Sequence, residues 1–111
     1  MRAISHPIRE QLSLPVVLHA LSDPIRLEIV RLLARVAELP CGELEAPVSK
    51  STLSHHLKVL RDAGLTQTRA VGVQRLVSLR AADLDARFPG LLGCVLEHSA
   101  RAAARASERL G

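Results

Sequence analysis

The sequence predicts a mainly α-helical domain that carries one small β-hairpin. The chain has 111 residues, 48% of them hydrophobic, which suits a single domain with a core of its own. Its one aromatic residue is Phe88, so the core must be aliphatic, a composition that favours helices over a sandwich or barrel. The spacing of apolar residues is helical except over residues 65–79, where it alternates.

Two helices are expected after an N-terminal arm, residues 1–14. Pro15 suits the first turn of a helix, and a run of apolar residues follows it. Asp23 and Pro24 are a typical N-cap and first residue for the second helix. In that helix apolar residues repeat every three or four positions, and Arg26 is expected with the other charged residues on the polar face.

The middle of the chain predicts a helix-turn-helix over residues 43–64. A short helical turn at 43–46 is followed by a tight turn and a helix at 50–63. Ser49 is the expected N-cap of that helix, and Gly64 stands where a left-handed glycine ends one. One face of the helix is aliphatic. The other face carries small polar and basic residues, namely Lys50, Ser51, Thr52, Ser54, His55 and Lys58.

After Gly64 the apolar period changes from that of a helix to that of a strand. Two alternating runs rich in β-branched residues meet at Gly72, which predicts a hairpin over residues 65–80. A hairpin beside a helix-turn-helix is a wing, so the predicted fold is a winged helix-turn-helix.

The C-terminal region, residues 83–110, is expected to be helical. It starts at Asp83 or Asp85 and is interrupted at 88–90. From Leu91 it continues as a long helix, which we expect to pair two copies of the chain in a homodimer.

Positive charge is concentrated on the predicted helix-turn-helix and wing. The chain has a net charge of +4. Residues 48–80 carry six Lys and Arg against one Asp, a net of +5, whereas residues 38–47 carry three Glu. Such a basic stretch is typical of a protein that binds a phosphate backbone.

The polar face of the helix at 50–63 has the properties of a DNA recognition helix. The major groove is about 12 Å wide and admits a helix whose leading end carries small polar residues. Its aliphatic face would hold it on the scaffold. On the hairpin, Arg69, Gln74 and Arg75 would reach flanking phosphates or the minor groove.

Two segments resemble a known family, the ArsR/SmtB winged-helix repressors. Residues 20–33, ALSDPIRLEIVRLL, are similar to its second helix, and residues 49–65, SKSTLSHHLKVLRDAGL, to its recognition helix and the entry into the wing. The resemblance implies a homodimer that binds double-stranded inverted-repeat DNA and is released by an inducer, whose identity it leaves open. It also implies that His56 packs on the scaffold. The positions that match base and phosphate contacts are Ser51, Thr52, Ser54, His55 and Lys58.

The sequence defines the inducer that the protein would sense less well than it defines the DNA-binding elements. Metal-sensing relatives use two cysteines before the recognition helix, but here Cys41 stands alone between Pro40 and Gly42, so neither a metal site nor another cofactor is expected. Cys94 and His98, one helical turn apart, are an alternative metal pair that a dimer would complete. Cys41 and Cys94 are candidates for a thiol or redox switch, and the alternative is that both are structural.

The sequence opposes two other function classes and a membrane location. A winged-helix module that binds protein instead of DNA would not need the basic stretch at 48–80. An enzyme is not expected, because the chain has no nucleophile–base pair, glycine-rich phosphate loop or paired carboxylates. No apolar run approaches the roughly 20 residues of a membrane span, and no signal peptide is visible, so a cytoplasmic protein without membrane partners is expected.

Overall fold

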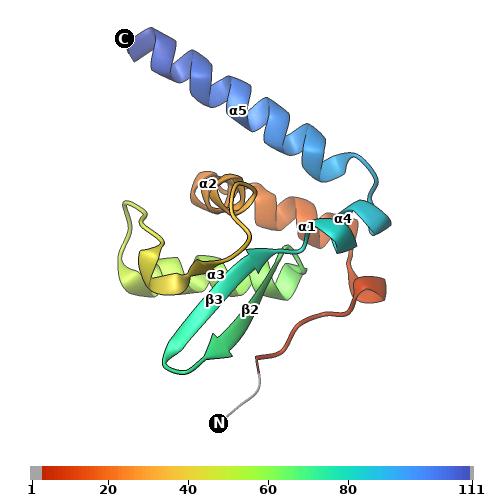
Figure 1. Cartoon of the computed structure of the whole chain (residues 1–111). Coiled ribbons are helices and arrows are strands. Elements are labelled where there is room, and N and C mark those ends of the chain that lie inside the picture. Colours follow the sequence, from red (N-terminus) through yellow and green to blue (C-terminus); the bar gives the residue numbers. More distant parts are fainter. Residues whose placement is uncertain (1–3, 111) are drawn as a thin grey trace.

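The computed structural model describes residues 4–110 and contains five α-helices, two short 3-10 helices and a three-stranded sheet (Figure 1). The prediction of a mainly helical chain with a small wing is therefore confirmed. In chain order the elements are η1 (Arg9–Gln11), α1 (Leu14–Leu21), α2 (Pro24–Leu33), β1 (Leu39–Pro40), η2 (Cys41–Glu43), α3 (Lys50–Ala63), β2 (Thr66–Val71), β3 (Gln74–Leu79), α4 (Ala81–Arg87) and α5 (Leu91–Leu110).

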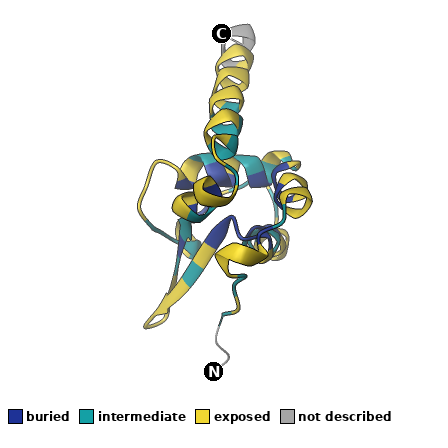
Figure 2. Cartoon of the chain, turned by 90° about the vertical axis from the view of Figure 1, so that its right-hand side faces the viewer, coloured by how far each residue is buried: buried dark blue, intermediate teal, exposed yellow. Residues whose placement is uncertain are grey.

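Helix α2 lies at the centre of the molecule. It contacts α1 and α3 on the side of the helix-turn-helix and α5 on the other side (Figure 1). The core between these helices is aliphatic, as expected, with Val30, Leu33, Leu60 and Leu65 at most 1% exposed. The start of α5 packs on this core, whereas its C-terminal part extends beyond it and is exposed (Figure 2).

Capping residues set the ends of α2 and α3 as predicted. Asp23 Oδ1 accepts hydrogen bonds from the backbone N–H groups of Ile25 (2.8 Å) and Arg26 (3.0 Å). Ser49 Oγ accepts from a backbone N–H in the first turn of α3, that of Thr52. Gly64 ends α3 with φ 87°, and a Cβ there would also collide with a side chain of the arm.

The predicted helical turn at 43–46 is wrong. The helical residues are Cys41–Glu43, in a 3-10 turn, Leu44 is extended, and no further helical residue follows before Lys50. Two forces oppose a helix at 43–46. Pro47 disfavours a helical conformation of the residue before it, and burial of Leu44, 6% exposed, turns that side chain into the core.

The wing contains one strand more than the sequence predicted. Strands β2 and β3 form the expected antiparallel hairpin, with Val71 opposite Gln74 next to the turn. Strand β1 adds to β3 on its other edge, with Leu39 opposite Val77, so the sheet order is β1-β3-β2. A two-residue strand that contains a proline has no periodicity to detect, and only its partner makes it a strand.

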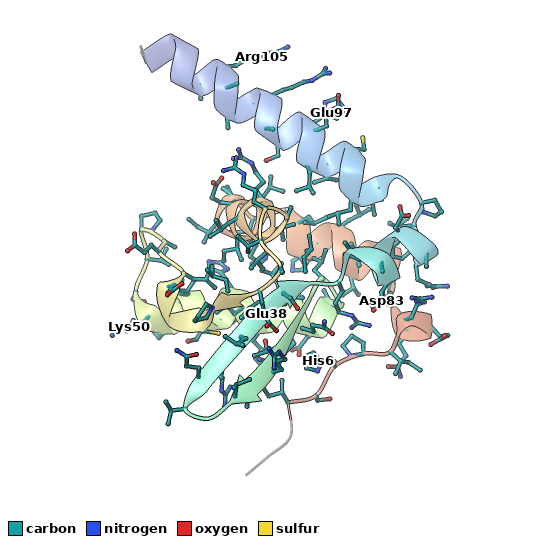
Figure 3. The ribbon with its side chains drawn as sticks, viewed as in Figure 1. His6, Glu38, Lys50, Asp83, Glu97 and Arg105 are labelled. Atoms are coloured by element: carbon teal, nitrogen blue, oxygen red, sulfur yellow. The ribbon has the colours of Figure 1, made fainter. Side chains whose placement is uncertain are left out.

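The N-terminal arm contacts β2 and the residue that follows β3, and its His6 lies beside the wing (Figure 3). The Thr68 backbone N–H in β2 donates to His6 Nε2 (3.0 Å), and the Arg80 guanidinium donates to the Pro7 carbonyl (2.7 Å). Helix α4 begins at Ala81, earlier than Asp83 or Asp85. The expected break at 88–90 is confirmed, so residues 83–110 belong to two helices and not one.

Candidate nucleic-acid interface

One face of α3 presents polar side chains to solvent. Positions that are three, four or seven residues apart share a face of a helix, and Ser51, His55, Lys58 and Asp62 follow this spacing. The structure therefore brings the predicted α3 residues together on its exposed side. All of Lys50, Ser51, Thr52, Ser54, His55 and Lys58 are exposed.

Hydroxyl groups gather at the N-terminus of α3. Ser49 Oγ donates to Thr52 Oγ1 (2.9 Å) and lies 3.2 Å from Ser51 Oγ. The first backbone N–H groups of a helix lack intrahelical partners, and its dipole favours anions at this end. The leading end of α3 is thus a surface of hydrogen-bond donors and acceptors without bulky side chains, although the cap already engages Thr52.

A buried network holds α3 in place, and Arg26 is its centre. Arg26 was expected on the polar face of its helix, but it is 8% exposed. Its guanidinium donates to the carbonyls of Ala20 (2.7 Å) and His19 (3.2 Å) and to Nδ1 of His56 (3.2 Å). The expectation that His56 contacts the scaffold is therefore correct in the structure. Three helices, α1, α2 and α3, meet in this one set of hydrogen bonds.

Lys58 forms an ion pair along the exposed face of α3. Its Nζ lies 2.6 Å from Oδ2 of Asp62, four residues later. Both side chains are more than half exposed, and such pairs contribute roughly 0.3–0.5 kcal/mol. A phosphate that approaches Lys58 can therefore replace Asp62 at little cost.

The wing holds its predicted basic residues in two different states. Gln74 and Arg75 are exposed on β3. Arg69 on β2 instead donates through Nε and Nη2 to the two carboxylate oxygens of Glu38, the latter at 2.7 Å. These bonds hold the pKa of Glu38 below its usual value and raise the pKa of Arg69. Sequence reasoning missed this pairing, although the acidic stretch 38–47 beside the basic one was its signal.

The two cysteines lie in different surroundings. Cys41 is half-buried in η2, beside the wing, and burial raises the pKa of its thiol, while the charges of Arg75 and Arg61 oppose that rise. Cys94 is exposed on α5. Both thiols are free.

Candidate metal ligands do not gather in the part of the chain that the structure describes. Within it, no group of three or more His, Cys, Asp or Glu side chains is placed to hold a metal ion. Cys94 and His98 are both exposed on α5. Across the same residues, none of the helices has the length and apolar character that crossing a bilayer requires.

An exposed polar helix face, a supporting hydrophobic scaffold and an adjacent basic wing define the class of this protein, a winged helix-turn-helix transcriptional regulator. A helix-turn-helix domain family matches residues 21–69. The chain is 43% identical over 79 residues to YceK of Bacillus subtilis, an uncharacterized HTH-type transcriptional regulator, covering 68% of this chain and 79% of the relative. This chain belongs to the ArsR/SmtB family.

Two further relatives support this family assignment. The arsenical resistance operon repressor of Staphylococcus xylosus is 42% identical over 79 residues, which cover 65% of this chain and 70% of the repressor. The solved structure of an ArsR-like transcriptional regulator from Rhodococcus sp. RHA1 is 32% identical, with a TM-score of 0.60 over 81% of this chain and 86% of that one. The predicted family and fold are thereby confirmed.

Proposed function

We propose that this protein is a homodimeric repressor that binds an inverted repeat in double-stranded DNA. The observation that carries the proposal is the exposed polar face of α3 beside Arg75 of the wing. In this proposal α3 is the recognition helix in the major groove. Ser51, Thr52, Ser54 and His55 read base edges, and Lys50, Lys58, Arg69, Gln74 and Arg75 contact the backbone or the minor groove.

The dimer part of the proposal has support in α1 and α5. Leu14, Val16 and Leu18 of α1 are between 41% and 48% exposed, an unusual number of large apolar side chains for an eight-residue helix. Helix α5 runs for 20 residues, and its outer part is exposed (Figure 2). A second copy that covers both helices would place the two recognition helices about 34–36 Å apart, one turn of DNA.

Release by an inducer is the third part of the proposal. A thiol-reactive agent acting on Cys41 or Cys94, or a small organic ligand, is favoured over a metal ion, because the described residues bring no group of three or more His, Cys, Asp or Glu side chains together to hold one. The protein acts in the cytoplasm, where the bacterial chromosome lies.

The test is binding of the purified full chain to labelled duplex from upstream of its own gene. Random duplex serves as the control, and each titration is run in reductant and after mild oxidation. We expect a tight, salt-sensitive complex on the upstream DNA and weaker binding to random duplex. Loss of the complex on oxidation supports the thiol switch, and an unchanged complex removes it. The absence of binding to any duplex at low salt overturns the repressor and favours a protein-interaction module.

A further inference from the structure

A cleft separates the recognition helix from the wing. It has a volume of about 190 Å³ and lies between α3, the strands β2 and β3, and η2. The residues that line it are Cys41, Ser54, Leu57, Arg61, Thr68 and Arg75. Arg61 and Thr68 are not among the residues that the sequence predicted to contact DNA.

The cleft contains cations without carboxylate partners. Neither Arg61 nor Arg75 forms an ion pair with any residue whose side chain is described, and no Asp or Glu lines the cleft. By contrast, Arg69 nearby is paired with Glu38. Arg61, Arg75 and Cys41 all line this cleft, and the two positive charges act to lower the pKa of the thiol.

Arg61 is half-buried, which distinguishes it from an ordinary surface arginine. It lies one turn beyond Leu57 and two turns beyond Ser54, on the side of α3 that faces the wing. A half-buried cation without a counter-charge is costly, and that cost falls when an anion joins it. Two guanidinium groups flanked by the hydroxyl residues Ser54 and Thr68 are suited to a phosphate.

The geometry of DNA binding places a phosphate here. When a recognition helix lies in the major groove and a wing reaches the adjacent minor groove, the sugar-phosphate backbone runs between them. The cleft between α3 and the wing is therefore the part of the protein that the backbone would cross. We propose that this cleft binds a phosphate group through Arg61 and Arg75, with Thr68 as a hydrogen-bonding partner. The inference rests on the proposed function insofar as the phosphate is that of DNA, and a free phosphate ion has the same chemistry.

Phosphate ethylation interference tests the site with Arg61→Gln, Arg75→Gln and a control, Arg35→Gln. Arg35 is exposed after α2, outside α3, the wing and the helices proposed to form the dimer, and its substitution removes the same charge. We expect Arg61→Gln to bind every duplex about tenfold more weakly than wild type. One phosphate in each half-site should weaken wild-type binding when ethylated. Both cleft variants should lose that sensitivity at the same phosphate.

Several outcomes would overturn the shared site. They are an interference pattern of Arg61→Gln that equals wild type at every phosphate, an affinity no lower than that of Arg35→Gln, and loss of sensitivity at different phosphates in the two cleft variants. Arg61→Lys keeps the charge but not the planar fork, so it should recover only part of the affinity. Urea unfolding of each variant shows that the fold is kept.

Calorimetry of the DNA-free protein with sodium phosphate, against sodium chloride at equal ionic strength, distinguishes a site for the phosphates of DNA from a site for a free phosphate ion. Weak binding that does not saturate, with no displacement of duplex beyond the chloride control, assigns the cleft to the DNA backbone. Saturable binding that Arg61→Gln abolishes, with displacement of duplex, assigns it to a free phosphate that acts as an effector. If wild type binds no duplex, the proposed function fails while calorimetry still tests the cleft. If wild type binds duplex but Arg61→Gln matches Arg35→Gln in both assays, the cleft inference alone fails.

Discussion

The guanidinium of Arg26 donates a hydrogen bond to Nδ1 of His56, 3.2 Å away, and so joins α2 to the recognition helix through a buried contact. An arginine can only donate, so Nδ1 accepts and the ring proton lies on Nε2, which is 4.0 Å from Oδ1 of Asp23. The residue that caps α2 and the residue that anchors α3 thus lie side by side. This contact helps to fix the exposed polar face of α3, the face proposed to read DNA, relative to α2.

Arg26→Met should destabilise the protein by about 2–3 kcal/mol. The substitution leaves the carbonyls of Ala20 and His19 and Nδ1 of His56 without their donor in a buried place. Urea unfolding followed by circular dichroism measures the change. Arg35→Met, at an exposed position after α2, is the matched control and should lie within about 0.5 kcal/mol of wild type. Equal stability of the two variants would show that the network is not important.

His55→Ala and Arg75→Ala should affect DNA binding in different ways. His55 is exposed on the reading face of α3, so its loss should change which sequence is preferred, by about 1–3 kcal/mol at one base pair. Arg75 should contact phosphate, so its loss should weaken binding to all sequences alike. Selection from a randomised duplex pool with each variant measures both effects. A uniform loss of affinity in both variants would contradict this division of roles.

Glu38→Gln should strengthen DNA binding. In the structure Glu38 accepts from two of the three guanidinium nitrogens of Arg69, Nε and Nη2, and removal of its charge frees them for phosphate. The slope of log affinity against log salt should become steeper by about one, the change expected for one additional phosphate contact. Glu45→Gln is the control, because Glu45 lies in the same acidic stretch, is exposed and makes the same charge change without freeing an arginine. Equal slopes in the two variants would show that Arg69 stays away from DNA.

The Cys41 thiol should react slowly at neutral pH. Burial raises its pKa, so the reactive thiolate forms only above the pH at which an ordinary thiol ionises, about 8.5. In a Cys94→Ser variant, the rate of alkylation by iodoacetamide should still be rising above that pH, as measured by mass spectrometry. Bound duplex should slow the reaction, since Cys41 lines the cleft between α3 and the wing. A rate that is already maximal at about pH 8 would contradict the burial argument.

Leu18→Glu should convert the proposed dimer to a monomer. Leu18 is 45% exposed on α1, and a carboxylate there would be buried without a partner if a second copy covers this face. Sedimentation velocity measures the change, and affinity for an inverted repeat should fall with it. Val36→Glu places the same charge at an exposed apolar residue outside α1 and α5 and should leave the dimer intact. Dimers of equal stability in both variants would exclude α1 from the interface.

The ends of α2 and α3 could be predicted from the sequence because their signals are local, whereas the helical turn expected at 43–46 was wrong. Asp23, Ser49 and Gly64 each act within a few residues of their own position, through a cap or a left-handed turn. The aliphatic stripe of α3 and the alternation of the wing are equally local. The exposed face of α3 followed directly from the stripe on its opposite side.

Other features depend on residues far apart in the chain, and the tertiary fold alone establishes them. Arg26 is buried because α1 and α3 place carbonyls and an imidazole around it, which outweighs its position in the helical pattern. Arg69 meets Glu38 because β1 pairs with β3 and brings that acidic segment to the wing, and β1 is a strand only through that partner. Arg61 lies in the cleft because the hairpin folds back along α3. The helix that carries a side chain can be predicted from the local spacing of apolar residues. The partner of that side chain depends on contacts between residues distant in the sequence, and no periodic pattern indicates those contacts.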